Sequence, residues 1–219
     1  MGADYYPRLA GMAHDNAEIN RLVNEQTEVA LLLSAPIFIA MIGLSPWVIH
    51  LLYSDSFTPA IDVLRWQILG DVLKVASWPM GFILLAKGEK GWFFWNELLA
   101  NVVSIGFLWG GIHFFGLKGT GIAFFALYAY QVVVILFVSK HLTGFSWHRN
   151  SKKLLLIATI LLLITSLIAY RVNTHNAAVL GCVISAITAW YSLKEITRLT
   201  GRNPIEAFLG KIRNMLPGR

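Results

Sequence analysis

Hydrophobic residues in this chain are grouped into long blocks rather than spread as a mosaic of short runs. Each block is about 20 residues long, the length that a helix needs to cross a hydrocarbon core of roughly 30 Å. A soluble domain would alternate apolar and polar positions over much shorter distances. The pattern therefore predicts six transmembrane helices, at residues 29–52, 64–86, 92–115, 119–139, 154–170 and 177–193.

The composition strengthens this prediction. Hydrophobic residues occupy 56% of the 219 positions and charged residues only 14%, whereas a soluble globular domain carries roughly 25% charged residues. We therefore expect an all-α integral membrane protein with about six transmembrane helices.

The basic residues lie mostly between the apolar blocks and indicate an orientation. If the N-terminus is cytoplasmic, six helices place 14 of the Lys and Arg residues on the cytoplasmic side and 3 on the far side, with Lys74 left inside a span. By the positive-inside rule, both termini are expected in the cytoplasm. The net charge of +6 then suits contacts with anionic membrane lipids, and no nucleic-acid partner is expected.

The predicted helices divide the chain into five segments. These are a polar cytoplasmic segment at 1–27, four helices within 28–140, a basic cytoplasmic loop at 141–153, two further helices within 154–194 and a basic cytoplasmic tail at 195–219. In the tail, apolar residues between 203 and 216 recur at helical spacing. This stretch fits either an amphipathic helix on the inner membrane surface or a solvated tail.

The second predicted helix carries an unusual row of polar residues. Gln67, Asp71, Lys74 and Trp78 follow one another at i, i+4, i+7 and i+11 and so share one face of a helix. A charge at the depth of Asp71 or Lys74 costs roughly 2.5–3.5 kcal/mol, so such residues face protein or a watery cavity. The two are expected to form an ion pair, either as a clamp or as part of a cavity-lining stripe.

The third predicted helix carries a second row. Glu97, Asn101 and Ser104 lie at i, i+4 and i+7, with Asn96 beside them. Glu97 is close enough to the cytoplasmic end to face lipid headgroups instead, whereas Asn101 is deeper and is expected to hydrogen-bond across helices. Gly106 and Gly110 form a GxxxG pattern that permits close helix contact.

Motifs for catalysis, metal binding or cofactor binding are absent from the sequence. It contains no HExxH, CxxC, GxSxG or Walker pattern, so neither an enzyme nor a cofactor is expected. The single cysteine, Cys182, lies in an apolar segment and permits no internal disulfide.

The region around the second predicted helix resembles a known family. The features that carry the resemblance are YYPRLAG at residues 5–11, Leu51-Leu52-Tyr53 with Phe57, the run WQILGDVLKV at 66–75 and Ala86-Lys87. Over roughly residues 4–100 the chain is similar to the O-antigen and enterobacterial common antigen flippases. These form the polysaccharide-transporter branch of the multidrug/oligosaccharidyl-lipid/polysaccharide (MOP) flippase superfamily.

The resemblance implies a fold and a function. Family members have two helical lobes around a central cavity, and this chain would supply the C-terminal lobe of a MATE/MOP-like flippase. The passenger would be an undecaprenyl-diphosphate-linked oligosaccharide crossing the bacterial inner membrane, with Gln67, Asp71, Lys74, Trp78, Glu97 and Asn101 as candidate cavity residues. Because alternating access needs two bundles, a separate N-terminal lobe or another polysaccharide-assembly protein is an expected partner.

Two other hypotheses remain open at this point. One is a membrane-embedded enzyme of envelope polysaccharide synthesis, such as a polymerase or ligase, although the longest external loop is short for that class. The other is a remnant, from a truncated reading frame, that does not transport.

Overall fold

The computed structural model describes residues 2–200, which contain helices and no strand. The elements are α1 (Gly2–Gly11), α2 (Asn16–Leu52), the 3-10 helix η1 (Asp55–Phe57), α3 (Ala60–Ala86), α4 (Lys90–Phe115), α5 (Lys118–Thr143), α6 (Arg149–Arg171) and α7 (Thr174–Thr200). Six of them, α2 to α7, are long and apolar enough to cross a membrane. The predicted fold class, an all-α integral membrane protein with six spans, is therefore confirmed and is the class expected of a flippase-like chain.

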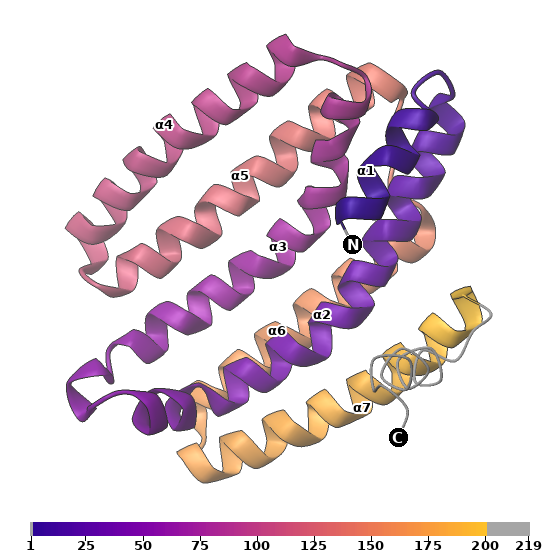
Figure 1. The fold of residues 1–219 in the computed structure, drawn as a ribbon. Coiled ribbons are helices and arrows are strands. Elements are labelled where there is room, and N and C mark those ends of the chain that lie inside the picture. The colour runs from indigo at the N-terminus through magenta and orange to yellow at the C-terminus, as the bar shows by residue number, and fades with distance from the viewer. Residues whose placement is uncertain (1, 201–219) are drawn as a thin grey trace, which may run out of the picture.

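The long helices lie side by side in an open layer. In Figure 1 the order across the molecule is α4, α5, α3, α2 and α7, with α6 packed behind α2. The most extensive contacts join α3 to α5 and α2 to α7, whereas α4 packs mainly on α5. Successive helices run in opposite directions, so the layer has an α1 end, at the upper right of Figure 1, and an η1 end opposite it.

Helix α2 begins well before the predicted span and is 37 residues long. At 1.5 Å per residue this is about 55 Å, more than the roughly 30 Å of a hydrocarbon core. The helix starts where the Asp15 side chain accepts hydrogen bonds from the backbone N–H groups of Ala17 and Glu18, which satisfies two donors that a helix start leaves free. The polar segment 1–27 is thus α1, a short connection and the first turns of α2.

A buried polar cluster, which we call the α2 polar cluster, joins the start of α2 to the α5–α6 connection. It consists of Asn20, Asn24, Glu28, Thr143 and Ser151. The fully buried Asn24 amide donates to the carbonyls of Asn20 (2.8 Å) and Ser146 (3.1 Å). Its side-chain oxygen accepts from the backbone N–H of His148 (2.7 Å) and from the Ser151 hydroxyl (2.9 Å). This one side chain therefore fixes the connection against α2.

Helix α1 packs across the end of the bundle. Tyr5 and Leu9 are buried in an apolar cluster with Met80 of α3, Val138 of α5 and Phe145. The Tyr5 hydroxyl donates to the carbonyl of Pro79 (3.2 Å). Burial raises the pKa of the Tyr5 phenol above its ordinary value, so the group stays neutral and keeps its donor.

Glycines bring two helix pairs into backbone contact. A Cβ on Gly43 of α2 would lie 2.9 Å from Gly181 of α7, and one on Gly119 of α5 would clash with the carbonyl oxygen of Gly111 of α4. Around Gly106 and Gly110, by contrast, nothing lies within 4 Å of an added Cβ. The close contacts are therefore made by other glycines than the GxxxG pair.

The η1 end holds the one charged residue of α3 that is almost fully buried. Arg65, which is 6% exposed, donates from Nε to Ser45 Oγ (3.1 Å), and its guanidinium lies 5.1 Å from the centre of the Tyr170 ring. Ser45 in turn donates to the carbonyl of Ile42 (2.8 Å), which has no intrahelical donor because Pro46 lacks an N–H. Arg65 is therefore part of the packing between α2, α3 and α6.

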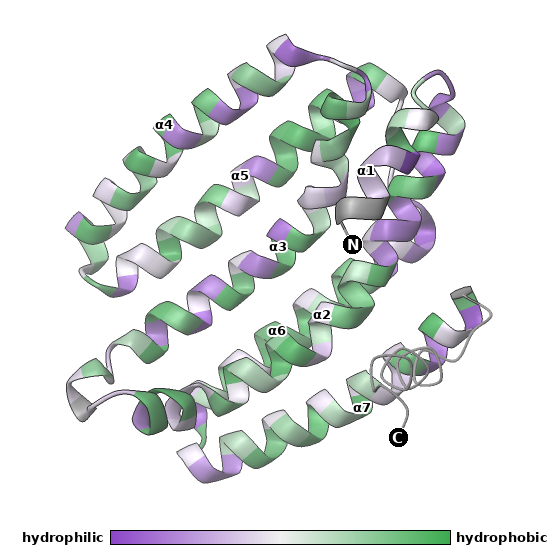
Figure 2. Ribbon diagram, in the orientation of Figure 1, coloured by the Kyte–Doolittle hydropathy of each residue, from purple (hydrophilic) through white to green (hydrophobic). Residues whose placement is uncertain are grey.

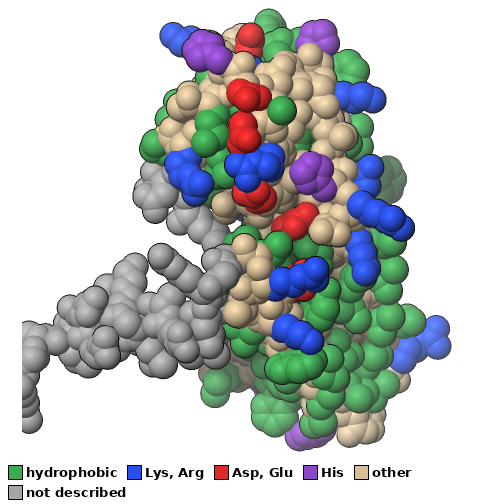
Figure 3. All heavy atoms as spheres, turned by 90° about the vertical axis from the view of Figure 1, so that its right-hand side faces the viewer, with side chains coloured by type: hydrophobic (Ala, Val, Ile, Leu, Met, Phe, Trp, Pro, Cys, Tyr) green, Lys and Arg blue, Asp and Glu red, His purple; other side chains and the backbone are tan. Residues whose placement is uncertain are grey.

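The surface has the pattern of a membrane protein. Figure 2 shows the middle of α6 largely hydrophobic, with its polar residues mainly at its two ends, whereas hydrophilic positions interrupt α3 and α4 along their length. Viewed toward α1, charged side chains gather mainly on the upper half of the face, and hydrophobic side chains cover most of the lower half (Figure 3). The residues after Thr200, including the predicted amphipathic stretch 203–216, lie outside the described part of the chain.

Candidate functional site

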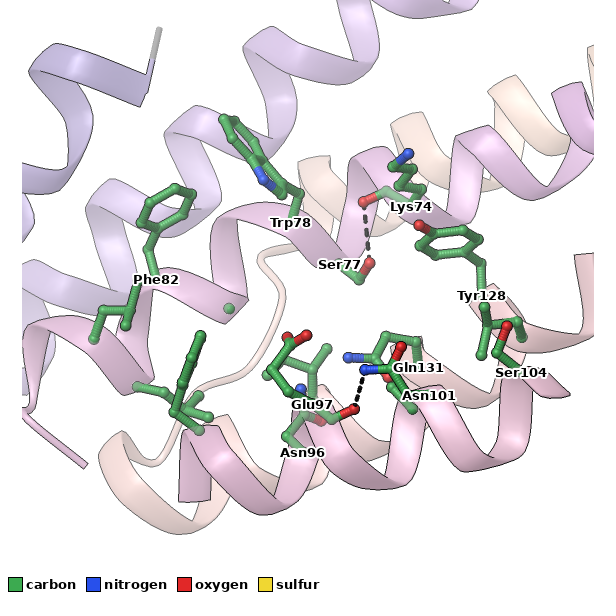
Figure 4. Close-up of a pocket in the computed structure, with 17 residues that line it drawn as sticks. Lys74, Ser77, Trp78, Phe82, Asn96, Glu97, Asn101, Ser104, Tyr128 and Gln131 are labelled. Atoms are coloured by element: carbon green, nitrogen blue, oxygen red, sulfur yellow. Dashed lines mark hydrogen bonds between the residues drawn. The ribbon is translucent and has the colours of Figure 1, made fainter. Parts of the chain in front are cut away.

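An open groove of about 380 Å³ lies between α3, α4 and α5. It runs along the layer from the middle of the helices toward the α1 end. Figure 4 shows its lining: the labelled residues are Lys74, Ser77, Trp78, Phe82, Asn96, Glu97, Asn101, Ser104, Tyr128 and Gln131. The groove therefore combines aromatic side chains with amides, hydroxyls and one charge of each sign.

Lys74 is the cation of the groove. Its side chain is exposed, and its ammonium lies 5.3 Å from the centre of the Tyr128 ring and 5.8 Å from that of Phe124. The ion pair expected with Asp71 is not formed among the described residues, because the ammonium turns to these rings of α5 instead. An ammonium over aromatic faces keeps its hydrogens available for an anion.

Asp71 and Gln67 do not line the groove. Both are half-buried. The row predicted on α3 is therefore divided: Lys74 and Trp78 line the groove, while Gln67 and Asp71 lie closer to the η1 end, outside it. The α3 residues that line the groove, Lys74 to Leu85, all belong to its α1-end half.

The row predicted on α4 does line the groove. Glu97, Asn101 and Ser104 all contribute to the lining, together with Asn96. Asn101 donates to the carbonyl of Glu97 in its own helix (2.8 Å) rather than across helices, contrary to expectation. Asn96 is the one α4 residue among those described that is buried, at 8% exposure.

Two polar residues of α5 complete the groove and are missing from the predicted set. Gln131 and Tyr128 face the α3 and α4 side chains in Figure 4. Gln131 is the more detectable from sequence, since it is a lone amide in the otherwise apolar stretch QVVVILFV. Its side-chain oxygen, like that of Asn96, is buried without a hydrogen-bond partner in the described chain.

The polar and aromatic lining of the groove suits the binding of a ligand. Within residues 2–200 no group of three or more His, Cys, Asp or Glu side chains is placed to hold a metal ion. Cys182 is exposed on α7. The groove can bind a molecule with an anionic part, hydroxyl groups and apolar edges.

Comparison with known proteins gives a partial relationship. No protein-family model and no solved structure matches the chain. Over 85 residues, 39% of the chain, it is 32% identical to the lipid III flippase of Escherichia coli (strain K12), and equally so to that of Shigella flexneri. The matched stretch covers 20% of the length of each relative.

This similarity bears on the predictions. Both relatives are flippases, which are transporters, so the prediction of a transporter-like chain rather than an enzyme is supported. Residues 2–200 contain six helices of membrane length, so the chain is a multi-pass membrane protein, and part of it is similar in sequence to flippases.

Proposed function

We propose that this chain forms part of a flippase that moves an undecaprenyl-diphosphate-linked oligosaccharide, of the O-antigen repeat-unit type, across the bacterial inner membrane. The single observation that carries the proposal is the groove between α3, α4 and α5, with one exposed lysine among amides and aromatic rings. The similarity of part of the chain to lipid III flippases gives the class of passenger, a lipid-linked one.

The chemistry of the groove suits such a passenger. A diphosphate needs a cation in a partly desolvated place, and the Lys74 ammonium provides one. Sugar hydroxyls need a mixture of hydrogen-bond donors and acceptors beside aromatic faces, which Asn101, Gln131 and Trp78 supply.

A second helix bundle would close the groove. Helix α4 packs mainly on α5, and its face bearing Glu97, Asn101 and Ser104 has no further helix over it in the described chain. Polar side chains on an uncovered membrane helix are unfavourable in lipid. A second lobe, or another polysaccharide-assembly protein, therefore fits over this face and would provide the other half of an alternating-access pair.

The orientation follows from charge. The basic helix termini at the α1 end support a cytoplasmic position for that end and for both termini of the chain. The groove would then open toward the cytoplasmic leaflet, where a lipid-linked passenger is collected.

Complementation tests the proposal. The full chain, alone and with a first-lobe polypeptide of a related flippase, is expressed in a flippase-null strain. Restored surface O-antigen with the partner, and none with the partner alone, is expected. Normal membrane insertion without restoration under any partner would contradict transport and favour a remnant, whereas longer glycan chains without restored export would favour a polymerase.

A further inference from the structure

The two ends of the groove offer opposite hydrogen-bonding groups. Lys74 and Tyr128 lie toward one end in Figure 4, and Glu97 and Asn96 toward the other. An ammonium is only a donor and a carboxylate only an acceptor. The groove is therefore polarised along its length, with a cation near the middle of α3 and an anion nearer the α1 end.

A second, independent observation concerns the end of the groove that carries Glu97 and Asn96, which we call the acceptor end. The Asn96 side chain is more than nine-tenths buried, and its oxygen has no hydrogen-bond partner in the described chain. The Asn101 amide donates one hydrogen to the Glu97 carbonyl, and its second hydrogen makes no bond to the Asn96 oxygen in the described chain. A buried acceptor left in this state is unfavourable unless a water or a ligand supplies a donor.

These features distinguish the parts of a lipid-linked sugar. A diphosphate is anionic and has acceptors but no donors, so it suits Lys74 and is repelled by Glu97. A sugar carries several hydroxyl donors, which suit the Glu97 carboxylate and the Asn96 oxygen. Trp78 also lines the groove. It is 46% exposed and packs edge-on against Phe82, with ring centres 5.0 Å apart, and so offers an aromatic surface to a sugar ring.

We propose that the groove holds its passenger in one orientation, with the diphosphate at Lys74 and the first sugars across Trp78 toward Glu97 and Asn96. This inference rests on the proposed function and adds to it the direction of the passenger. Glu97 acts as a specificity residue, because it favours the binding of a headgroup with hydroxyl groups and disfavours the binding of a diphosphate without a sugar.

Binding to two probes tests the orientation. The purified full chain in lipid nanodiscs is titrated with a polyprenyl diphosphate and with the same lipid carrying one N-acetylglucosamine. In the wild type the sugar is expected to tighten binding. Glu97→Gln and Asn96→Leu should each remove most of that gain, about tenfold, and Glu97→Gln should leave the bare lipid bound equally or more tightly. Lys74→Met should weaken both probes by a similar factor.

The controls keep the two proposals separable. Glu89→Gln and Lys90→Met make the same charge changes at exposed positions outside the groove lining and should leave both affinities unchanged. The orientation is overturned if Glu97→Gln weakens the bare lipid, or if Lys74→Met removes only the gain from the sugar, since either result reverses the passenger. Absence of binding to both probes in the wild type would instead overturn the proposed function itself.

Discussion

The α2 polar cluster and the groove both place polar side chains among apolar helices, but the hydrogen-bond partners of these side chains differ. Each polar atom of the Asn24 side chain has protein partners, drawn from α2 and from the connection before α6. In the groove, Lys74 lies over aromatic rings, and the oxygens of Asn96 and Gln131 have no partner in the described chain. The polar residues of the α2 polar cluster therefore stabilise the fold, whereas those of the groove are available to bind a ligand.

The largest expected effect is on the α2 polar cluster. Asn24→Leu removes hydrogen bonds and leaves buried partners unsatisfied, so we expect the free energy of unfolding to fall by about 3 kcal/mol. Denaturant titration in mild detergent, followed by circular dichroism, measures it. The matched variant Asn101→Leu loses one exposed bond within its own helix and should change stability by less than about 1 kcal/mol. Equal losses in the two variants would remove the contrast.

The second prediction concerns the helix pair that bounds the groove. Gly119→Ala drives a methyl group into the Gly111 carbonyl, so α4 and α5 must separate, at an expected loss of about 2 kcal/mol. Gly106→Ala, where an added Cβ meets nothing within 4 Å, should be neutral or stabilising by about 0.5–1 kcal/mol. The same unfolding assay applies, and a neutral Gly119→Ala would mean that the two helices do not approach closely.

The third prediction concerns the cation of the groove. Lys74→Met should lower export at least tenfold in the complementation assay, because a charge-assisted contact to the diphosphate, worth roughly 1.5–3 kcal/mol, is lost. Stability should be unchanged or slightly raised, since an uncompensated charge leaves the membrane. Lys90→Met is the control. Normal glycan display by Lys74→Met would exclude this residue from the mechanism.

The smallest effect is expected at Asp71. Because this carboxylate lies outside the groove lining and forms no ion pair with Lys74 in the described chain, Asp71→Asn should change export less than about threefold. The charge swap of Asp71 and Lys74 should fail to restore activity. A swap that recovers export would instead favour a clamp between the two residues.

Much of the fold could be predicted from hydropathy alone. Five of the six spans begin and end close to the observed helices, because lipid requires long apolar segments and satisfied backbone groups. The start of α2 could not be predicted in this way. Its polar residues Asn24 and Glu28 are buried only because partners more than 120 residues later in the chain satisfy them, and no local pattern reveals such partners.

The site could be predicted in part, for a related reason. Helical spacing grouped Glu97, Asn101 and Ser104, and all three line the groove from one face of α4. On α3 the same spacing grouped four residues, but only Lys74 and Trp78 line the groove, which ends before Asp71 and Gln67. The spacing of residues along one helix predicts which face of that helix they share. How far a groove extends along that face depends on where the neighbouring helices cross it.

The contact between Gly43 and Gly181 also has a consequence for biosynthesis. Helix α7 rests on α2 through these glycines and through a hydrogen bond from Ser185 to the Pro36 carbonyl (2.7 Å). About 140 residues separate the two surfaces, and at 5–20 residues per second their synthesis takes roughly 7–28 s. Throughout that interval the surface of α2 around Gly43 lacks its α7 partner, so α2 completes its packing only after α7 has been synthesised.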